Sequence, residues 1–212
     1  NPLTPIQLTI DNLKSKFLEN IDDERKVKYQ DNLKTIQKQI KQIENLVNEF
    51  SDFARMPKPL FKKNNLYEVI NENIILLNKI DPNIEIKIIN HLTKDAFLNF
   101  DYEQFNRLFF NLIKNSIESI AEKAQKDSKI NKNIDIEIRG RRDYIIINLF
   151  DTGIGFKNRN TKDLIKPYFT TKEKGTGLGL SIVDKIVSDH NGSINFLNQN
   201  NGAKIQIIIP NK

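Results

Sequence analysis

The strongest constraint on the fold is a long apolar stripe near the start of the chain. Its members recur at alternating intervals of three and four residues, which places them along one side of a helix of several turns. They are Leu33, Ile36, Ile40, Ile43, Val47, Phe50 and Ala54. A shorter stripe with the same spacing precedes it and consists of Ile6, Ile10, Leu13 and Phe17. With the charged residues 22–25 as the connection, residues 1–56 are predicted to form an antiparallel helical hairpin.

Two such helices cannot cover both of their own apolar stripes. A second copy of the hairpin would complete a four-helix bundle, so we expect a homodimer. The alternative is that the hairpin packs on the rest of its own chain.

The long helix is expected to end at Pro57 and Pro59, because proline lacks a backbone N–H and disfavours helix in the residue before it. We expect a linker over 57–65 and a second domain over 66–212. That domain mixes the two periodicities, with helices expected at about 66–79, 102–126 and 178–190 and strands at about 84–90, 96–100, 134–139, 144–150, 193–197 and 204–209.

The composition excludes several classes of protein. No apolar run approaches the roughly 20 residues that a membrane-spanning helix needs. The absence of cysteine excludes disulfides, thiolate metal sites and cysteine nucleophiles, and two histidines are too few for a typical zinc site. The net charge of +6 comes from Lys and Arg that are interleaved with Asp and Glu. This pattern favours a solvated basic surface over nucleic-acid binding.

Four features in a fixed order carry the chemistry. The first is the pair Asn111 and Asn115, which the i, i+4 spacing puts on one face of a helix. A side-chain amide oxygen is a hard, neutral ligand suited to a Mg²⁺ ion that already carries phosphate oxygens and water. The alternative is a pair of solvent-facing amides in an asparagine-rich chain.

The second feature is the segment 151–155, Asp-Thr-Gly-Ile-Gly, which follows an apolar strand. A carboxylate at a strand end can accept a hydrogen bond from an amino group such as that of adenine, and glycines let the backbone approach a flat ring. The alternatives are a plain strand-end turn or the Asp-Thr-Gly turn of an aspartic protease. The protease is disfavoured because Ile154 and Gly155 follow where those motifs have a small residue, and because the chain is rich in helix.

The third feature is 167–172, Pro-Tyr-Phe-Thr-Thr-Lys, and the fourth is 175–180, Gly-Thr-Gly-Leu-Gly-Leu, which opens a helix. Glycine-rich backbone at a helix N-terminus offers free N–H groups and the positive end of the dipole to an anion. Lys172 can add a point charge for a terminal phosphate. The P-loop motif and the protein-kinase signatures are absent, and Leu180 stands where a dinucleotide fingerprint has its third glycine.

Together these features resemble the N, G1, F and G2 boxes of sensor histidine kinases, within the wider group of ATP-binding proteins that includes gyrase, MutL and Hsp90. The resemblance covers essentially the whole chain, and segments 1–6 and 169–172 look most like the NtrY-type nitrogen-regulation kinases. It implies an α+β fold in which the hairpin is the dimerisation and histidine phosphotransfer domain. The second domain would be an α/β sandwich that binds ATP, with a mixed sheet and helices on one face.

The resemblance also implies a role for each motif residue. Asn115 would coordinate a Mg²⁺ ion that bridges the ATP phosphates, with Asn111 lining the same site. Asp151 would read the adenine amino group, Phe169 would anchor a mobile lid, and Lys172 would face the terminal phosphate. The base pocket and the triphosphate cradle would be formed by Gly153, Ile154 and Gly155 and by Gly175, Thr176, Gly177, Leu178, Gly179 and Leu180.

In the family motif HExxNP, the phosphorylated histidine lies four residues before the asparagine. Asn1 and Pro2 match the end of that motif, so we expect the phosphoacceptor just upstream of Asn1 and no autophosphorylation of the present chain. Asn1 would also orient water for phosphatase action on a response regulator, the expected partner. Neither His91 nor His190 lies in acceptor context. The full-length protein would be held in the cytoplasmic membrane by missing N-terminal segments, with this part in the cytoplasm.

Two other functions stay open. Gyrase, MutL and Hsp90 hydrolyse ATP with a glutamate four residues before the metal-binding asparagine. Here that position is Asn111, which cannot act as a general base, so a kinase is favoured over an ATPase or conformational switch. A nucleotide-free dimeric docking module is the other alternative. Glu118 departs from the family pattern, in which a basic residue is frequent three positions after the metal-binding asparagine.

Overall fold

The computed structural model describes residues 4–17, 23–92, 97–127, 129–156, 161–170, 172 and 175–211. Contacts divide the chain into two compact units. One contains Asn1–Met56 with Lys172–Lys174, and the other contains Pro57–Thr171 with Gly175–Lys212. Across the described ranges, every helix is too short or too polar to span a bilayer.

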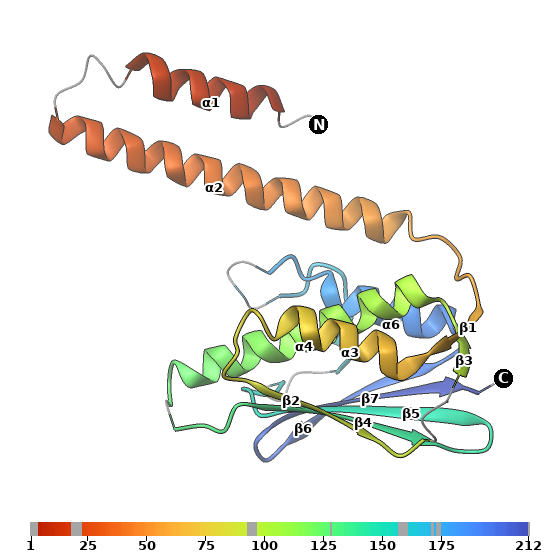
Figure 1. Ribbon diagram of the computed structural model, residues 1–212. Helices are drawn as coiled ribbons and strands as arrows, with labels where there is room; N and C mark the ends of the chain where they lie inside the picture. The colour runs from red at the N-terminus through yellow and green to blue at the C-terminus, as the bar shows by residue number, and fades with distance from the viewer. Residues whose placement is uncertain are drawn as a thin grey trace. The chain divides into compact units, whose positions relative to one another are not determined.

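The first unit is a helical hairpin made of α1 (Thr4–Phe17) and α2 (Asp23–Ala54). Figure 1 shows the two helices running alongside each other in opposite directions. Ile10 of α1 packs with Leu33 and Ile40 of α2, which lie about two helical turns apart on the same side of α2. The hairpin expected from the two apolar stripes is therefore present.

A second apolar row on α2 stays outside this small core. Ile36, Ile43, Val47 and Phe50 are each between 45% and 48% exposed, although they belong to the same sequence stripe as Leu33. The stripe is thus wider than the surface that α1 covers, and one hairpin leaves part of it in contact with water.

The second unit is built on a five-stranded mixed sheet. Its strands are β2 (Glu85–Asn90), β4 (Asn133–Gly140), β5 (Tyr144–Asp151), β6 (Ser193–Gln199) and β7 (Gly202–Pro210). Their spatial order is β2-β4-β5-β7-β6; β2 and β4 are parallel, and the other neighbours are antiparallel. Buried apolar residues recur at every second position along β4, β5 and β7, so one face of the sheet is apolar and buried.

Three helices cover that apolar face: α3 (Leu66–Leu77), α4 (Tyr102–Ala124) and α6 (Gly179–Asp189). Figure 1 shows them on the same side of the sheet. α4 begins where the Asp101 carboxylate accepts a hydrogen bond from the Gln104 N–H at 3.0 Å and so caps the helix. The α/β sandwich with helices on one face is the predicted fold class.

Residues 57–65, which we expected to be a linker, pack within the second unit. The Leu60 N–H donates to Asp101 Oδ2 at 2.7 Å, and the Gln104 side-chain amide donates to the Pro57 carbonyl at 2.9 Å. After them β1 (Lys62–Asn65) pairs antiparallel with β3 (Phe97–Phe100) in a two-stranded ribbon. The sequence Lys-Lys-Asn-Asn lacks the apolar alternation that predicts a strand. These residues form a strand because their backbone pairs with β3.

One short helix, α5 (Thr161–Leu164), also lies in a segment without a periodic apolar pattern. It falls within residues 156–174, the approximate range of the lid that the family resemblance implies. Its four residues are too few for a helical period to be visible.

His190 joins the end of α6 to the start of α4. The Asp101 N–H donates to His190 Nε2 at 3.1 Å, and Nδ1 lies 2.8 Å from the Ile186 carbonyl. Because a backbone N–H can only donate, Nε2 is the acceptor and Nδ1 carries the proton, which makes the ring neutral. Edge-on contacts with Phe61 and Phe105 bury the ring further. This histidine is structural and is not placed to be phosphorylated.

We expect the second unit to lose stability as the pH drops below about 6.5, the ordinary histidine pKa. Burial lowers the pKa of His190 in the folded chain, so the unfolded chain takes up a proton first. The stability that the neutral ring contributes is complete above about pH 6.5 and is lost as the pH falls toward the folded pKa. His190→Gln keeps an acceptor but does not titrate.

The test is urea unfolding followed by circular dichroism at about pH 7.5 and about pH 5.5, on either side of the ordinary histidine pKa. The midpoint of His190→Gln should change less between the two than the native midpoint. An equal change in both proteins would contradict the assignment.

Candidate functional site

Asp151 is the last residue of β5, and its carboxylate is held from two sides. Oδ1 accepts a hydrogen bond from the Gly153 N–H at 2.9 Å, and Oδ2 accepts one from the Ser116 hydroxyl of α4 at 3.2 Å. The residue is only 7% exposed. Burial raises the pKa of the Asp151 carboxyl, while these hydrogen bonds and the charge of Lys123 act in the opposite direction. The Asp151 carboxylate is therefore a hydrogen-bond acceptor with a fixed orientation that is largely shielded from water.

The glycines after Asp151 let the chain lie directly on α4. A Cβ on Gly153 would come within 2.1 Å of Ser119 Oγ, so no larger residue fits there. The Ile154 N–H donates to the same hydroxyl at 3.0 Å. Gly155 has φ +66, a backbone conformation that side chains with a Cβ rarely adopt. Residues 152–156, named the base loop here, therefore have a fixed path past the helix.

The turn between β6 and β7 supports the other side of the base loop. Asn198 Oδ1 accepts a hydrogen bond from the Phe156 N–H at 2.8 Å. Gly202 has φ +121, and a Cβ there would come within 1.8 Å of the Asp151 carbonyl oxygen. The sequence did not indicate this support, because Gly202 is distant in sequence from the motif that it contacts.

Three further residues of α4 that contact the base loop or Asp151 were also missed: Ser116, Ser119 and Lys123. Lys123 Nζ donates to the Thr152 carbonyl at 3.0 Å and also to Asn201 Oδ1. Their spacing of three and four residues places them on one side of the helix, C-terminal to Asn115. That periodicity is visible in the sequence. Polar residues are common on helix surfaces, however, so the spacing does not by itself indicate a site.

The predicted amide pair lies against the start of α6. A Cβ on Gly179 would be 3.1 Å from Asn111 Oδ1 and 3.6 Å from Asn115 Nδ2, so the glycine brings the backbone close to both amides. Asn111 Nδ2 donates to the Arg107 carbonyl at 2.8 Å, which fixes the side chain and leaves Oδ1 directed toward Gly179. The first and fourth predicted motifs are therefore neighbours in space.

The glycine-rich segment also contacts the third motif. Gly177 has φ +73, and a Cβ there would lie 2.5 Å from the carbonyl carbon of Tyr168 and 2.7 Å from the nitrogen of Phe169. Leu178 is fully buried and precedes the helix, while Thr176 Oγ1 accepts from the Leu178 N–H at 3.4 Å. Within the described residues, no side chain caps the N-terminus of α6. Its first N–H groups are thus suited to an anion.

One helix therefore connects the two ends of the site. Asn111 and Ser119 are about 12 Å apart along α4 at the usual rise per residue. Asn111 lies at the glycine-rich start of α6, and Ser119 lies at the base loop. An extended ligand with a planar group at one end and anionic groups at the other matches this arrangement.

Two predicted residues are not brought into this geometry. Asn1 lies outside the described residues. Lys172 belongs to the unit that contains the hairpin, so its role at a terminal phosphate stays a prediction. Among the described residues, no group of three or more His, Asp or Glu side chains could hold a metal ion. Any metal at this site would depend on the neutral amides and on the ligand itself.

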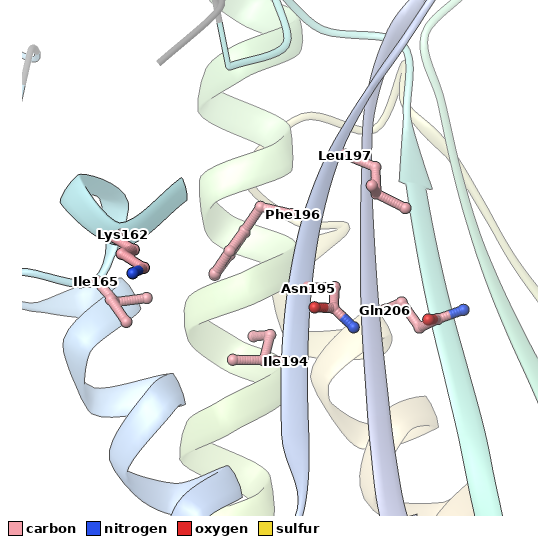
Figure 2. Close-up of a pocket in the computed structure, with 7 residues that line it drawn as sticks. All are labelled: Lys162, Ile165, Ile194, Asn195, Phe196, Leu197 and Gln206. Carbon is pink, nitrogen blue, oxygen red and sulfur yellow. The ribbon is translucent and has the colours of Figure 1, made fainter. Parts of the chain in front are cut away.

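A groove of about 480 Å³ beside β6 is distinct from this site (Figure 2). Ile194 and Phe196 point from β6 toward Ile165. The groove is lined by Lys162, Ile165, Ile194, Asn195, Phe196, Leu197 and Gln206. It includes none of the residues predicted from the four motifs.

Comparison with known proteins finds a family match in each unit of the chain. Residues 100–212 match the family of histidine kinase-, DNA gyrase B- and HSP90-like ATPases, and residues 1–59 match the His Kinase A phosphoacceptor domain. The nitrogen regulation protein NtrY of Azorhizobium caulinodans is 34% identical over 99% of this chain and 27% of its own length. A putative NtrY-like sensor histidine kinase of Rickettsia felis is 33% identical over 98% of this chain and 33% of its own length.

The chain thus spans a third or less of the length of these relatives, and the expected likeness to NtrY-type kinases is confirmed. Solved structures agree on the fold. The catalytic domain of histidine kinase ThkA has a TM-score of 0.62 at 27% identity, covering 72% of this chain and 96% of that domain. ThkA in complex with the response regulator TrrA has a TM-score of 0.71 at 24% identity, covering all of this chain and 58% of ThkA.

The matches over both units, in the order that the sequence motifs predicted, show that the chain belongs to the family of histidine kinase-, DNA gyrase B- and HSP90-like ATPases, with a His Kinase A domain before the catalytic domain.

Proposed function

We propose that this chain is the kinase core of an NtrY-like sensor histidine kinase. It binds ATP with Mg²⁺ and directs the γ-phosphoryl group to a histidine that precedes Asn1 in the longer protein. From there the group passes to an aspartate of a response regulator. The observation that carries the proposal is the position of α4. Its Ser116 and Ser119 contact the Asp151 carboxylate and the base loop, and its amide pair lies at the glycine-rich start of α6.

Base recognition is assigned to Asp151 and the base loop. The carboxylate accepts a hydrogen bond from the adenine amino group, because the protein donors that hold it do not use all of its lone pairs. Gly153 keeps the floor of the pocket thin, so that the ring can lie close to the backbone. Ile154 and Gly155 complete the pocket wall.

Phosphate recognition is assigned to the amide pair and to the segment 175–180. Asn111 Oδ1 and the side-chain amide of Asn115 lie beside Gly179 at the start of α6. Neutral amide oxygens of this kind fit a hard cation that shares its shell with phosphate oxygens. When bound, Mg²⁺ neutralises phosphate charge. The α6 N-terminus stabilises the remaining negative charge, and Lys172 adds a cation near the terminal phosphate. Positioning and charge neutralisation then supply most of the rate of in-line transfer.

Transfer is favoured over hydrolysis by the nature of residue 111. Hydrolysis needs a base that can take a proton from water, and an amide cannot do this. Asn111 also uses its Nδ2 to donate to the Arg107 carbonyl, which fixes it as a structural and liganding side chain. The response regulator is proposed as the partner because ThkA, a structural neighbour, has been solved with the regulator TrrA.

Asp151→Asn should abolish most nucleotide affinity without lowering stability. Burial raises the pKa of Asp151 in the folded chain above its pKa in the unfolded chain, so the charged carboxylate costs stability at neutral pH. This cost is absent below the unfolded pKa and appears as the pH rises through the folded pKa. The amide removes that charge but is a poorer acceptor for adenine. Affinity for an ATP analogue should fall at least about tenfold, the value of one hydrogen bond of about 1.5 kcal/mol to a charged group.

Calorimetry measures the affinity, and urea unfolding at about pH 7 measures the stability. Asp143→Asn, the same change at an exposed turn, is the matched control and should leave both unchanged. Absence of binding by the native chain would support the nucleotide-free docking module instead. Unchanged affinity in Asp151→Asn would remove this carboxylate from the site.

The second test concerns the acceptor. Incubation with γ-labelled ATP should leave the present chain unlabelled, whereas the chain extended upstream to include the motif histidine should take up acid-labile label. His91 is half-exposed and pairs with Glu137, and His190 is buried and neutral, so neither should accept the group. Acid-labile label on the present chain would refute the upstream acceptor. Steady release of free phosphate would support the ATPase.

The third test concerns the homodimer, which we propose from the exposed row on α2. Ile43→Lys places a charge in the middle of that row and should weaken the dimer, because the second hairpin would have to bury it. Asn45→Lys adds the same charge on the opposite side of α2 and should leave the association unchanged. Sedimentation equilibrium compares the two. Equal association constants would contradict an interface along this row.

A further inference from the structure

We propose that Lys123 is a positioning residue that holds the base loop in register with Asp151 and thereby makes the site prefer adenine over guanine nucleotides. The inference rests on the proposed function, since it concerns how the same site selects its base. Lys123 belongs to none of the four sequence motifs, and no role has been assigned to it above.

Lys123 connects three segments that are distant in sequence. Its Nζ, on α4, donates to the Thr152 carbonyl at 3.0 Å and to Asn201 Oδ1 in the turn between β6 and β7. The next residue is Gly202, the first of β7, whose backbone lies against the Asp151 carbonyl. One ammonium group therefore fixes the base loop against both of its supports.

The contact with Thr152 acts on Asp151 through a single peptide unit. The Thr152 carbonyl and the Gly153 N–H belong to the same planar group and point in opposite directions. Lys123 holds the carbonyl end, and the N–H end donates to Asp151 Oδ1 at 2.9 Å. The cation polarises the peptide and strengthens its N–H as a donor, so the carboxylate is oriented by a connected chain of hydrogen bonds.

The same ammonium group supplies the charge that balances the carboxylate. α4 faces Asp151 with Ser116 and Lys123, and β7 faces it with Ala203, so within the described residues Lys123 is the charged group that acts on it. Burial raises the pKa of Asp151 and the charge of Lys123 lowers it. An ionised carboxylate accepts from the adenine amino group, whereas a protonated one can donate to the guanine carbonyl. Lys123 therefore favours the adenine-reading form.

The test compares the binding of ADP and GDP by calorimetry across about pH 5.5 to 8, which lies above the ordinary carboxyl pKa, because burial moves the pKa of Asp151 upward. In Lys123→Met, ADP affinity should fall about tenfold, roughly the effect of losing one hydrogen bond to a charged group. The pH below which ADP binding weakens should move upward, and the ratio of ADP to GDP affinity should fall. Lys123→Arg should restore the pH profile, because it keeps the charge and a donor.

Two variants separate charge from support. Asn201→Ala removes one partner of Nζ but keeps the cation, so the pH profile and the ADP to GDP ratio should stay native. Lys126→Met removes an exposed charge just beyond the C-terminal end of α4 and should change neither quantity. Failure of the native chain to bind ADP would overturn the proposed function itself. If the native chain binds ADP, the decisive result is the Lys123→Met variant. A native pH profile and a native ratio of ADP to GDP affinity in that variant would overturn the role of Lys123, even if its affinity fell equally for both nucleotides.

Discussion

The packing of α4 on the sheet is the interaction on which the second unit depends. Its apolar side is fully buried and consists of Phe105, Leu108, Phe109, Leu112, Ile113, Ile117 and Ile120. Each residue advances about 100° around a helix, so burying that side also determines where Asn115, Ser119 and Lys123 point. A slip of one residue would turn them all away from the base loop. The packing of α4 in the core therefore also sets the positions of these side chains at the site.

The buried carboxylate of Asp151 shows how the fold balances stability against recognition. Desolvation disfavours the charge, and the fold offsets this with the Gly153 N–H, the Ser116 hydroxyl and the charge of Lys123. All of these groups belong to the protein itself. A base that donates to the carboxylate then gains a hydrogen bond without first reorganising the protein, which is the advantage of a preorganised site.

Much of this arrangement was predictable from local pattern. The asparagine spacing placed Asn111 and Asn115 on one face, and the glycines marked both loops that approach α4, because each is required by a positive φ or a close contact. The residues that were missed act through tertiary contact alone. Ser119 and Lys123 look like ordinary helix surface, and β1 has no apolar alternation. Their partners are dozens of residues away, so no window along the chain contains the information.

The hairpin differs from the second unit, because one chain does not bury all of its apolar surface. Its described core consists of Ile10, Leu33 and Ile40, with Leu13 and Tyr29 at the edge. Such a core is small for two helices of 14 and 32 residues, since ordering each residue carries an entropic cost. The exposed row on α2 holds further apolar surface that is not yet buried. Burial against a second copy would supply the missing stabilisation, and folding and dimerisation would then be a single equilibrium that depends on protein concentration.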